Sequence, residues 1–232
     1  MSWGALIVAA GRGTRFGRPK QLIEIAGKPM IAWSVEAFAS IADITDMVLV
    51  TEPEYVEQVD AFARKLVGNL DLRVVSGGVE RQDSVRIGLG AFPDRTHAVL
   101  VHDGARPMIR ADDVRRGMAV VAPGVAALLA TPVVDTIKQL DRDGKVVRTL
   151  DRTLLWAAQT PQFATLSDLR RAHRDAEKSG LRVTDDATLL ERAGLDVLAV
   201  DGHPENFKVT FPADFVRAET ILRDRAPSEV KR

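Results

Sequence analysis

The sequence contains no cysteine, so disulfide bonds, zinc–thiolate sites and thiol nucleophiles are excluded. It also lacks any apolar run near the roughly 18 residues needed to cross a bilayer, and we expect no membrane partner. A net charge is missing as well, because 32 basic and 32 acidic residues give a formal charge of +0. This balance argues against a nucleic-acid binder that acts through a global basic field, so any cationic site must be local.

What remains is an ordinary globular composition, with 46% hydrophobic and 28% charged residues among 232. The N-terminal residues MSWGALIVAA have no basic segment before their apolar stretch. They predict a first strand rather than a signal peptide. We therefore expect a cytoplasmic protein.

Apolar runs of strand length recur along the chain and are mostly continuous, which is typical of strands buried on both faces of a parallel sheet. They cover Ala5–Ala10, Asp46–Thr51, Leu72–Val75, Ala98–His102, Val125–Thr131 and Asp196–Val200. Amphipathic helical patterns alternate with them at Met30–Ser40, Tyr55–Leu66, Ser84–Phe92 and Asp112–Val121. This alternation predicts an α/β fold with an open, mostly parallel sheet.

The stretch PVVDTIKQLDRDGKVVRTLDR, residues 132–152, interrupts the alternation. Two β-rich limbs flank Asp143-Gly144, a strong signal for a hairpin turn. A lone two-stranded hairpin is marginally stable in water, so we expect this β-arm to pack on a second copy of the chain. The alternative is a hairpin folded back on its own domain. We expect a single domain over residues 1–225 with the arm inserted, and a charged tail at 226–232.

In residues 4–20, GALIVAAGRGTRFGRPK, the predicted strand Ala5–Ala10 is followed by a loop that contains glycines. Gly11 and Gly13 would let the backbone approach a ligand where open α/β sheets bind one. The spacing alone also occurs in nicotinamide- or flavin-binding folds. Those folds begin a helix inside the loop and place an acidic residue ~20 positions on. Here an irregular stretch follows the loop, and the second strand ends near Thr51-Glu52, about twice that distance away.

The loop also carries four cations, Arg12, Arg15, Arg18 and Lys20. Attack at the α-phosphorus of a nucleotide places charge on the non-bridging oxygens and on the departing pyrophosphate. Fixed guanidinium and ammonium groups stabilise that charge. The alternative is a solvated basic loop without a role in chemistry.

Three further motifs follow later strands. In SGGVERQDS, residues 76–84, the glycines and Ser84 could read the edge of a base, or form only a turn and a helix cap. In VHDGARP, residues 101–107, Asp103 at a strand end suits Mg²⁺, and Arg106 could bind a second anion. His102 is better explained as a packed strand residue. Lys208 in the strand-like, apolar NFKVT is either functional, which we favour, or snorkelling.

Seven motifs occur in the order AAGRGTRFG…PKQ, SGGVERQDSV, VHDGARP, PVVDTIK, LDRTLLWAAQTPQ, TDDATLLE and NFKVTFPAD. Together they resemble the 2-C-methyl-D-erythritol 4-phosphate cytidylyltransferases of the non-mevalonate isoprenoid pathway. The resemblance runs from about Ala5 to Leu222. The first motif alone is typical of the broad nucleotidyltransferase superfamily, whereas HDGARP, DTIK, QTPQ and KVT are more specific.

The resemblance implies a Rossmann-like α/β domain whose β-arm interlocks in a homodimer. It implies CTP and 2-C-methyl-D-erythritol 4-phosphate as substrates, pyrophosphate as the leaving group, and Mg²⁺ or another divalent cation. The implied catalytic cations are Arg15 and Lys20. The implied CTP-binding residues are Ala9, Ala10, Gly11, Gly13, Gly78, Ser84 and Asp103, and Asp103 is also the metal ligand. The implied residues for the second substrate are Arg106, Thr160 and Lys208, with Thr136 and Arg152 from the other subunit.

The nucleophile would be a phosphate oxygen that is already anionic near neutral pH, so no general base is required. Three alternatives stay open at this point. A cytidylyltransferase for another sugar or alditol phosphate, such as ribitol 5-phosphate, would differ in the residues for the second substrate. A nicotinamide-dependent oxidoreductase would bind NAD(H), and a nucleotide sensor would bind CTP without turnover.

Overall fold

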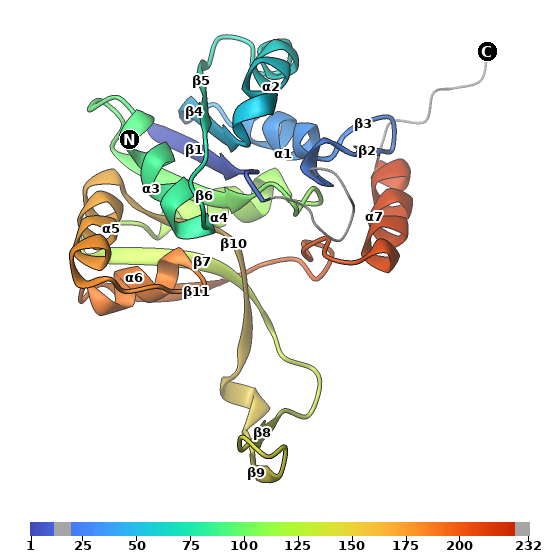
Figure 1. Ribbon diagram of the computed structural model, residues 1–232, viewed down its shortest axis with the longest axis vertical. Coiled ribbons are helices and arrows are strands. Elements are labelled where there is room, and N and C mark those ends of the chain that lie inside the picture. Colours follow the sequence, from blue (N-terminus) through green and yellow to red (C-terminus); the bar gives the residue numbers. More distant parts are fainter. Residues whose placement is uncertain (12–19, 226–232) are drawn as a thin grey trace.

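The computed structural model describes residues 1–11 and 20–225, and Lys20 by its backbone alone. The strands of its main sheet are β1 (Trp3–Val8), β4 (Ile44–Thr51), β5 (Asp71–Ser76), β6 (Ala98–Asp103), β7 (Val125–Pro132), β10 (Trp156–Thr165) and β11 (Asp196–Asp201). Within the described residues their order is β11-β7-β10-β6-β1-β4-β5 (Figure 1). Only β10 in this sheet pairs antiparallel with its neighbours. The predicted open, mostly parallel α/β sheet is confirmed.

Helices cover both faces of this sheet. They are α1 (Met30–Ala39), α2 (Val56–Ala63), α3 (Arg81–Ala91), α4 (Ala111–Ala119), α5 (Leu166–Ser179) and α6 (Asp186–Arg192). The core under α1, α2 and α4 contains Phe38 and Ile7, whereas the core under α3, α5 and α6 contains Leu6 and Val85. Adjacent residues of β1 thus point into opposite cores. Because each face of the strand is buried, the strand sequences are continuously apolar.

A smaller layer lies beside the sheet. The short strands β2 (Glu24–Ile25) and β3 (Lys28–Pro29) pair antiparallel, and α7 (Pro212–Arg225) packs near them (Figure 1). Ile25 and Leu222 belong to one buried apolar cluster there. The remaining short elements are the 3-10 helices η1 (Lys20–Leu22), η2 (Pro53–Tyr55) and η3 (Arg152–Leu154).

The arm leaves the body of the molecule where β7 and β10 run beyond the sheet (Figure 1). Its tip is the hairpin of β8 (Lys138–Leu140) and β9 (Val146–Thr149). Gly144 in the tip turn has a φ of +82°, a conformation that favours glycine. The hairpin predicted around Asp143-Gly144 is confirmed, and the arm projects from the body instead of folding back on it.

Some sequence-based boundaries were wrong. The first strand covers Trp3–Val8 rather than Ala5–Ala10, so Ala9 and Ala10 belong to the loop that follows it. The pattern did not reveal β10, α5, α6 or α7. The segment at 206–210 is irregular rather than strand-like. It is held against the strand-end loop by a hydrogen bond of 2.8 Å from Val209 N–H to the Ala105 carbonyl.

The helix predicted over Ser84–Phe92 begins three residues earlier, at Arg81. Glu80 is its N-cap residue. Its side chain accepts from the Asp83 backbone while the Asp83 side chain accepts from the Glu80 backbone. This reciprocal capping satisfies donors of the first turn, which is why the helix begins directly after the glycine turn.

The order of the strands creates a switch point. The chain places β4 and β5 on one side of β1 and then crosses to β6 on the other side. In open α/β sheets ligands bind outside the carboxyl ends of the strands at such a point. Among the helices of the described residues, none has both the length and the apolar character that a bilayer crossing requires.

Candidate active site

A cavity of about 450 Å³ opens at the carboxyl ends of β1, β4, β5 and β6. Each of these strands contributes residues at or after its end, among them Gly11, Glu52, Gly78 and Asp103. Lys208 reaches the same cavity from the segment before α7. The volume lies within the range of small-molecule sites, and the position is the switch point of the sheet.

One wall of the cavity is the glycine turn after β5. A Cβ atom on Gly77 would lie 2.3 Å from Ala10 Cβ, and one on Gly78 would lie 2.5 Å from Asp83 Cβ. Both contacts are shorter than real Cβ atoms allow. Gly77 therefore brings the backbone of the turn against the loop after β1, and Gly78 brings it against the first turn of α3. Both leave peptide groups rather than side chains beside the cavity.

Ser84 supports this turn from within α3. Its buried hydroxyl accepts from Gly78 N–H at 3.1 Å and donates to the Glu80 carbonyl at 3.1 Å. Ser84 also contributes to the lining of the cavity. The hydroxyl therefore fixes the shape of the turn, whichever contact it makes to a ligand.

Asp103, the last residue of β6, lies between two cations. Arg81 Nε donates to its Oδ1 at 2.9 Å, and Lys208 Nζ donates to its Oδ2 at 2.8 Å. Burial alone would raise the pKa of Asp103, but the charges of Arg81 and Lys208 outweigh burial and hold that pKa well below its usual range. The carboxylate is ionised at neutral pH.

The backbone of Asp103 is fixed from behind. Asp103 N–H donates to Thr160 Oγ1 at 3.0 Å, Thr160 Oγ1 lies 3.1 Å from His102 Nδ1, and His102 Nε2 lies 3.2 Å from the Arg106 carbonyl. These partners assign a donating Nε2–H and an accepting Nδ1. Burial lowers the pKa of His102 to about 3, so the ring is neutral. The prediction that His102 is a packed strand residue is confirmed.

Arg106 follows β6 in the chain, three residues after Asp103. Its Nη1 donates to the Asn206 carbonyl at 2.8 Å. Burial lowers the pKa of Arg106, although the charge of Asp103 acts in the opposite direction. Asn206 is fully buried and donates to the Thr160 carbonyl at 2.9 Å. The segment that carries Lys208 is therefore tied both to the loop after β6 and to β10.

The structure brings together only part of the predicted site. The predicted residues that line the cavity are Ala10, Gly11, Gly78, Ser84, Asp103 and Lys208. Ala9 and Thr160 are buried, and Thr160 contacts the site through the backbone of Asp103. Thr136 and Arg152 are exposed residues of the arm, which projects away from the body (Figure 1). Gly13, Arg15 and the side chain of Lys20 lie outside the described residues.

The sequence-based prediction did not select Arg81. Arg81 is the first residue of α3, and a cation is unfavourable at the positive end of a helix dipole. A cation in that position indicates a specific anionic partner. Here the partners are two carboxylates, of which Asp103 is one.

The residues present suit a divalent cation held mainly by its substrate. Among residues 1–11 and 20–225, no three His, Cys, Asp or Glu side chains gather as a metal site. Mg²⁺ commonly takes one or two carboxylates and completes its shell with phosphate oxygens and water. Asp103 fits as such a carboxylate, because each of its oxygens has a lone pair beyond the hydrogen bond it accepts.

The fold and the site together define a nucleotide-binding enzyme of the nucleotidyltransferase class. The sheet is an open α/β sheet, the cavity at its switch point is lined by backbone peptide groups, and an ionised carboxylate lies there between two cations. Residues 4–224 match the family model described as IspD: 2-C-methyl-D-erythritol 4-phosphate cytidylyltransferase. The chain belongs to this family, and the resemblance seen in its motifs is confirmed. The family membership does not favour an oxidoreductase, a sensor or another cytidylyltransferase.

Individual relatives and solved structures agree with this family assignment. The chain is 42% identical over 226 residues to 2-C-methyl-D-erythritol 4-phosphate cytidylyltransferase of Prochlorococcus marinus strain MIT 9313, covering 95% of this chain and 98% of the relative. The crystal structure of the enzyme of that name from Thermus thermophilus has a TM-score of 0.76 at 31% identity, covering 96% and 100%. That of 4-diphosphocytidyl-2C-methyl-D-erythritol synthase from Anaerococcus prevotii has a TM-score of 0.85 at 26% identity, covering 96% and 98%.

Proposed function

We propose that this chain transfers the cytidylyl group of CTP to 2-C-methyl-D-erythritol 4-phosphate and releases pyrophosphate. The observation that carries the assignment is Asp103, an ionised carboxylate that contacts both Arg81 and Lys208 at the switch point. Such a site stabilises the charge of phosphoryl transfer without a nucleophilic side chain. Residues 1–225 would act as one nucleotidyltransferase domain.

CTP occupies the cavity between the loop after β1 and the glycine turn after β5. The backbone at Ala10 and Gly11 would approach the phosphates, and the carbonyl groups at Gly77 and Gly78 would accept hydrogen bonds from the edge of the cytosine. The N–H groups of the two glycines are already used, because they donate to the Thr51 carbonyl at 2.8 Å and to Ser84 Oγ at 3.1 Å. Arg15, which lies between this loop and η1 in the sequence, and Lys20, the first residue of η1, would stabilise charge at the α-phosphate.

The second substrate lies beside Lys208 and Arg106. Thr136 and Arg152 would complete this side from the arm of a partner subunit, because the arm carries them away from the cavity of their own chain (Figure 1). The arm also exposes apolar side chains, with Val134 77% and Leu154 80% exposed. An isolated hairpin with such a surface gains stability by packing on another chain. We therefore propose a homodimer, and we keep its cytoplasmic location as a prediction.

Mg²⁺ or another divalent cation would be held by Asp103 together with CTP phosphate oxygens. When bound, such an ion neutralises phosphate charge. Lys208 shares the carboxylate, and its side chain is 42% exposed, so it can turn toward the second substrate when the ion takes its place.

The reaction exchanges one phosphorus–oxygen bond for another. An oxygen of the methylerythritol phosphate group attacks the α-phosphorus of CTP. The bond from this phosphorus to the bridging oxygen breaks, and the electron pair leaves with pyrophosphate. The side chains of the protein hold the two reactants in line and stabilise the charge that develops. Since the attacking oxygen is already anionic, no proton has to be removed.

The test is pyrophosphate release from the purified protein with CTP and Mg²⁺, with 2-C-methyl-D-erythritol 4-phosphate and ribitol 5-phosphate in parallel. We expect release with the first acceptor and little with the second. Release that favours ribitol 5-phosphate would overturn the second-substrate site while keeping the reaction class. A protein that releases pyrophosphate with neither acceptor would contradict the proposed function.

A further inference from the structure

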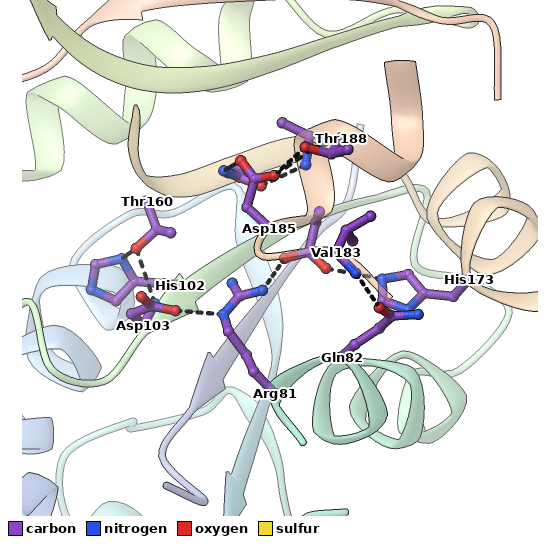
Figure 2. Close-up of polar contacts among 12 residues, drawn as sticks. Arg81, Gln82, His102, Asp103, Thr160, His173, Val183, Asp185 and Thr188 are labelled. Carbon is purple, nitrogen blue, oxygen red and sulfur yellow. Dashed lines mark hydrogen bonds and ion pairs between the residues drawn. The ribbon is translucent and has the colours of Figure 1, made fainter. Parts of the chain in front are cut away.

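Arg81 connects the active-site carboxylate to the opposite helical layer. Its Nε donates to Asp103 Oδ1 at 2.9 Å, and its Nη1 donates to Asp186 Oδ2 at 2.9 Å. Asp103 and Asp186 belong to β6 and α6 and are far apart in the sequence. The guanidinium therefore uses two different nitrogens to span two elements. Figure 2 shows Arg81 reaching Asp103 on one side.

Asp186 is a rigid anchor for this guanidinium. Its side chain is only 1% exposed, and His173 Nε2 of α5 lies 2.9 Å from its other oxygen, Oδ1. Asp186 is also the first residue of α6, where the helix dipole favours a negative charge. Burial alone would raise the pKa of Asp186, but the charge of Arg81 and the bond to His173 keep that pKa below its usual value. Asp186 is therefore a fixed anion that is held by Arg81, by His173 and by the N-terminus of α6.

The two cations on Asp103 differ in how firmly they are held. Lys208 contacts Asp103 through one ammonium group on a flexible stem, and its side chain is 42% exposed. Arg81 has a side chain that is 25% exposed and a second carboxylate that holds it in place. A ligand that enters the cavity can displace Lys208 by rotation of its side chain. To displace Arg81 it must break the contact with Asp186 as well.

We propose that Arg81, anchored by Asp186 and His173, is a positioning residue that fixes the Asp103 carboxylate through Oδ1 and leaves Oδ2 as its exchangeable side. Oδ2 is then the oxygen available to a metal ion when Lys208 turns toward the second substrate. This inference rests on the proposed cytidylyl transfer. It adds a defined task for three residues outside the predicted site.

An arginine is required for this task because the two carboxylates approach the guanidinium at different nitrogens. A lysine has a single ammonium group and cannot hold both carboxylates in the observed geometry. The charge near Asp103 would be kept in Arg81→Lys, but the orientation of Asp103 would be lost. This difference separates positioning from simple charge compensation.

The experiment compares Arg81→Ala, Arg81→Lys and Asp186→Asn with Arg86→Ala as the matched control. Arg86 lies on the same helix and pairs with Glu177 at 3.2 Å, on the surface. Steady-state pyrophosphate release gives kcat and the two KM values, calorimetry gives CTP affinity, and thermal unfolding reports folding. Ethylguanidinium is then added to Arg81→Ala and, as a control, to the wild-type protein.

We expect Arg81→Ala and Arg81→Lys to lower kcat by about 10–100-fold, the scale for groups that orient a ligand-bearing side chain. Asp186→Asn should lower kcat in the same direction, and its CTP affinity measured without metal ion should stay close to the wild-type value, because Asp186 does not line the cavity whereas Arg81 does. Ethylguanidinium should restore part of the kcat of Arg81→Ala, because it supplies the guanidinium group that the substitution removes. The double variant with Asp186→Asn and Arg81→Ala should have a kcat close to that of Arg81→Ala alone, since both substitutions remove the same interaction.

A kcat for Arg81→Lys equal to that of Arg86→Ala would overturn the proposal, since charge alone would then suffice. A folded Arg81→Ala that ethylguanidinium does not restore would also overturn it, because a purely structural role predicts that result. If Arg81→Ala does not fold, Asp186→Asn decides, and a kcat equal to that of the control contradicts the proposal. Failure of the proposed function is separate, because the wild-type protein itself would then release no pyrophosphate.

Discussion

Lys208 Nζ lies 2.8 Å from Asp103 Oδ2, although the two residues are 105 positions apart in the chain. The contact joins the cation proposed for the second substrate to the carboxylate proposed for the metal ion. In this pairing each neutralises the other beside the cavity. Binding of CTP with its metal ion would free Lys208, and the protein would then offer an unpaired ammonium group to the incoming phosphate.

We predict that Lys208→Met lowers kcat/KM for 2-C-methyl-D-erythritol 4-phosphate by about 10–100-fold. This is the scale of one hydrogen bond to a charged group, about 1.5–3 kcal/mol. The KM for CTP should change less, because the ammonium group of Lys208 is assigned to the acceptor phosphate, although the side chain also lines the cavity. Initial rates with each substrate varied in turn provide the measurement. Lys65→Met, an exposed lysine after α2, is the control, and an equal rise of both KM values would contradict the assignment.

We also predict that Gly77→Ala weakens CTP binding. The new Cβ would lie 2.3 Å from Ala10 Cβ and 2.7 Å from Ser84 Oγ, so the turn must move away from the loop after β1. Overpacking of this kind lowers the free energy of unfolding by about 1–3 kcal/mol. We expect calorimetry to show CTP affinity about tenfold lower, equivalent to about 1.4 kcal/mol.

The control for that substitution is Gly90→Ala on α3, where a Cβ would have no neighbour within 4 Å. There the free energy of unfolding should stay the same or rise by up to about 1 kcal/mol, because alanine favours a helix. CTP affinity should not change. If Gly77→Ala also binds CTP like the wild-type protein, the turn is not the wall of the nucleotide site.

The strands that carry the site were predictable because burial on both faces makes their sequences continuously apolar. The glycine pair and Asp103 were predictable because each lies at the end of such a strand. The irregular backbone around Lys208 was not, since its conformation is set by contacts with distant residues such as Arg106. The link from Arg81 to Asp186 was equally hidden. It exists only because α3 and α6 pack on the same face of the sheet.

His102 should make the stability of the protein depend on pH. Burial lowers its pKa to about 3 from the ordinary value of 6.5. Between these values the unfolded chain binds a proton on His102 that the folded chain does not. The free energy of unfolding therefore falls as the pH falls through this window. From pH 7 to pH 5 the contribution of His102 is a loss of about 2 kcal/mol.

Urea unfolding at pH 7 and pH 5, followed by tryptophan fluorescence, measures this loss. The free energy of unfolding should fall by about 2 kcal/mol less between pH 7 and pH 5 in His102→Gln than in the wild-type protein. The lowered pKa values of Asp103 and Asp186 act in the same direction, but only below about pH 4. An identical pH dependence in the two proteins would mean that the pKa of His102 is not lowered in the folded protein.

The last prediction concerns the site shared between subunits. Arg152→Ala removes a residue of the arm, and Lys20→Ala removes a residue next to the nucleotide loop. Each variant alone should be nearly inactive. If the arm of one subunit completes the site of the other, a mixed dimer contains one site with both changes and one site with neither. Unfolding, mixing and refolding equal amounts should therefore recover about a quarter of the wild-type rate, because about half of the dimers are mixed. A mixture no more active than its two components would show that Arg152 acts within its own chain or not at all, and sedimentation of the same samples would show whether dimers had formed.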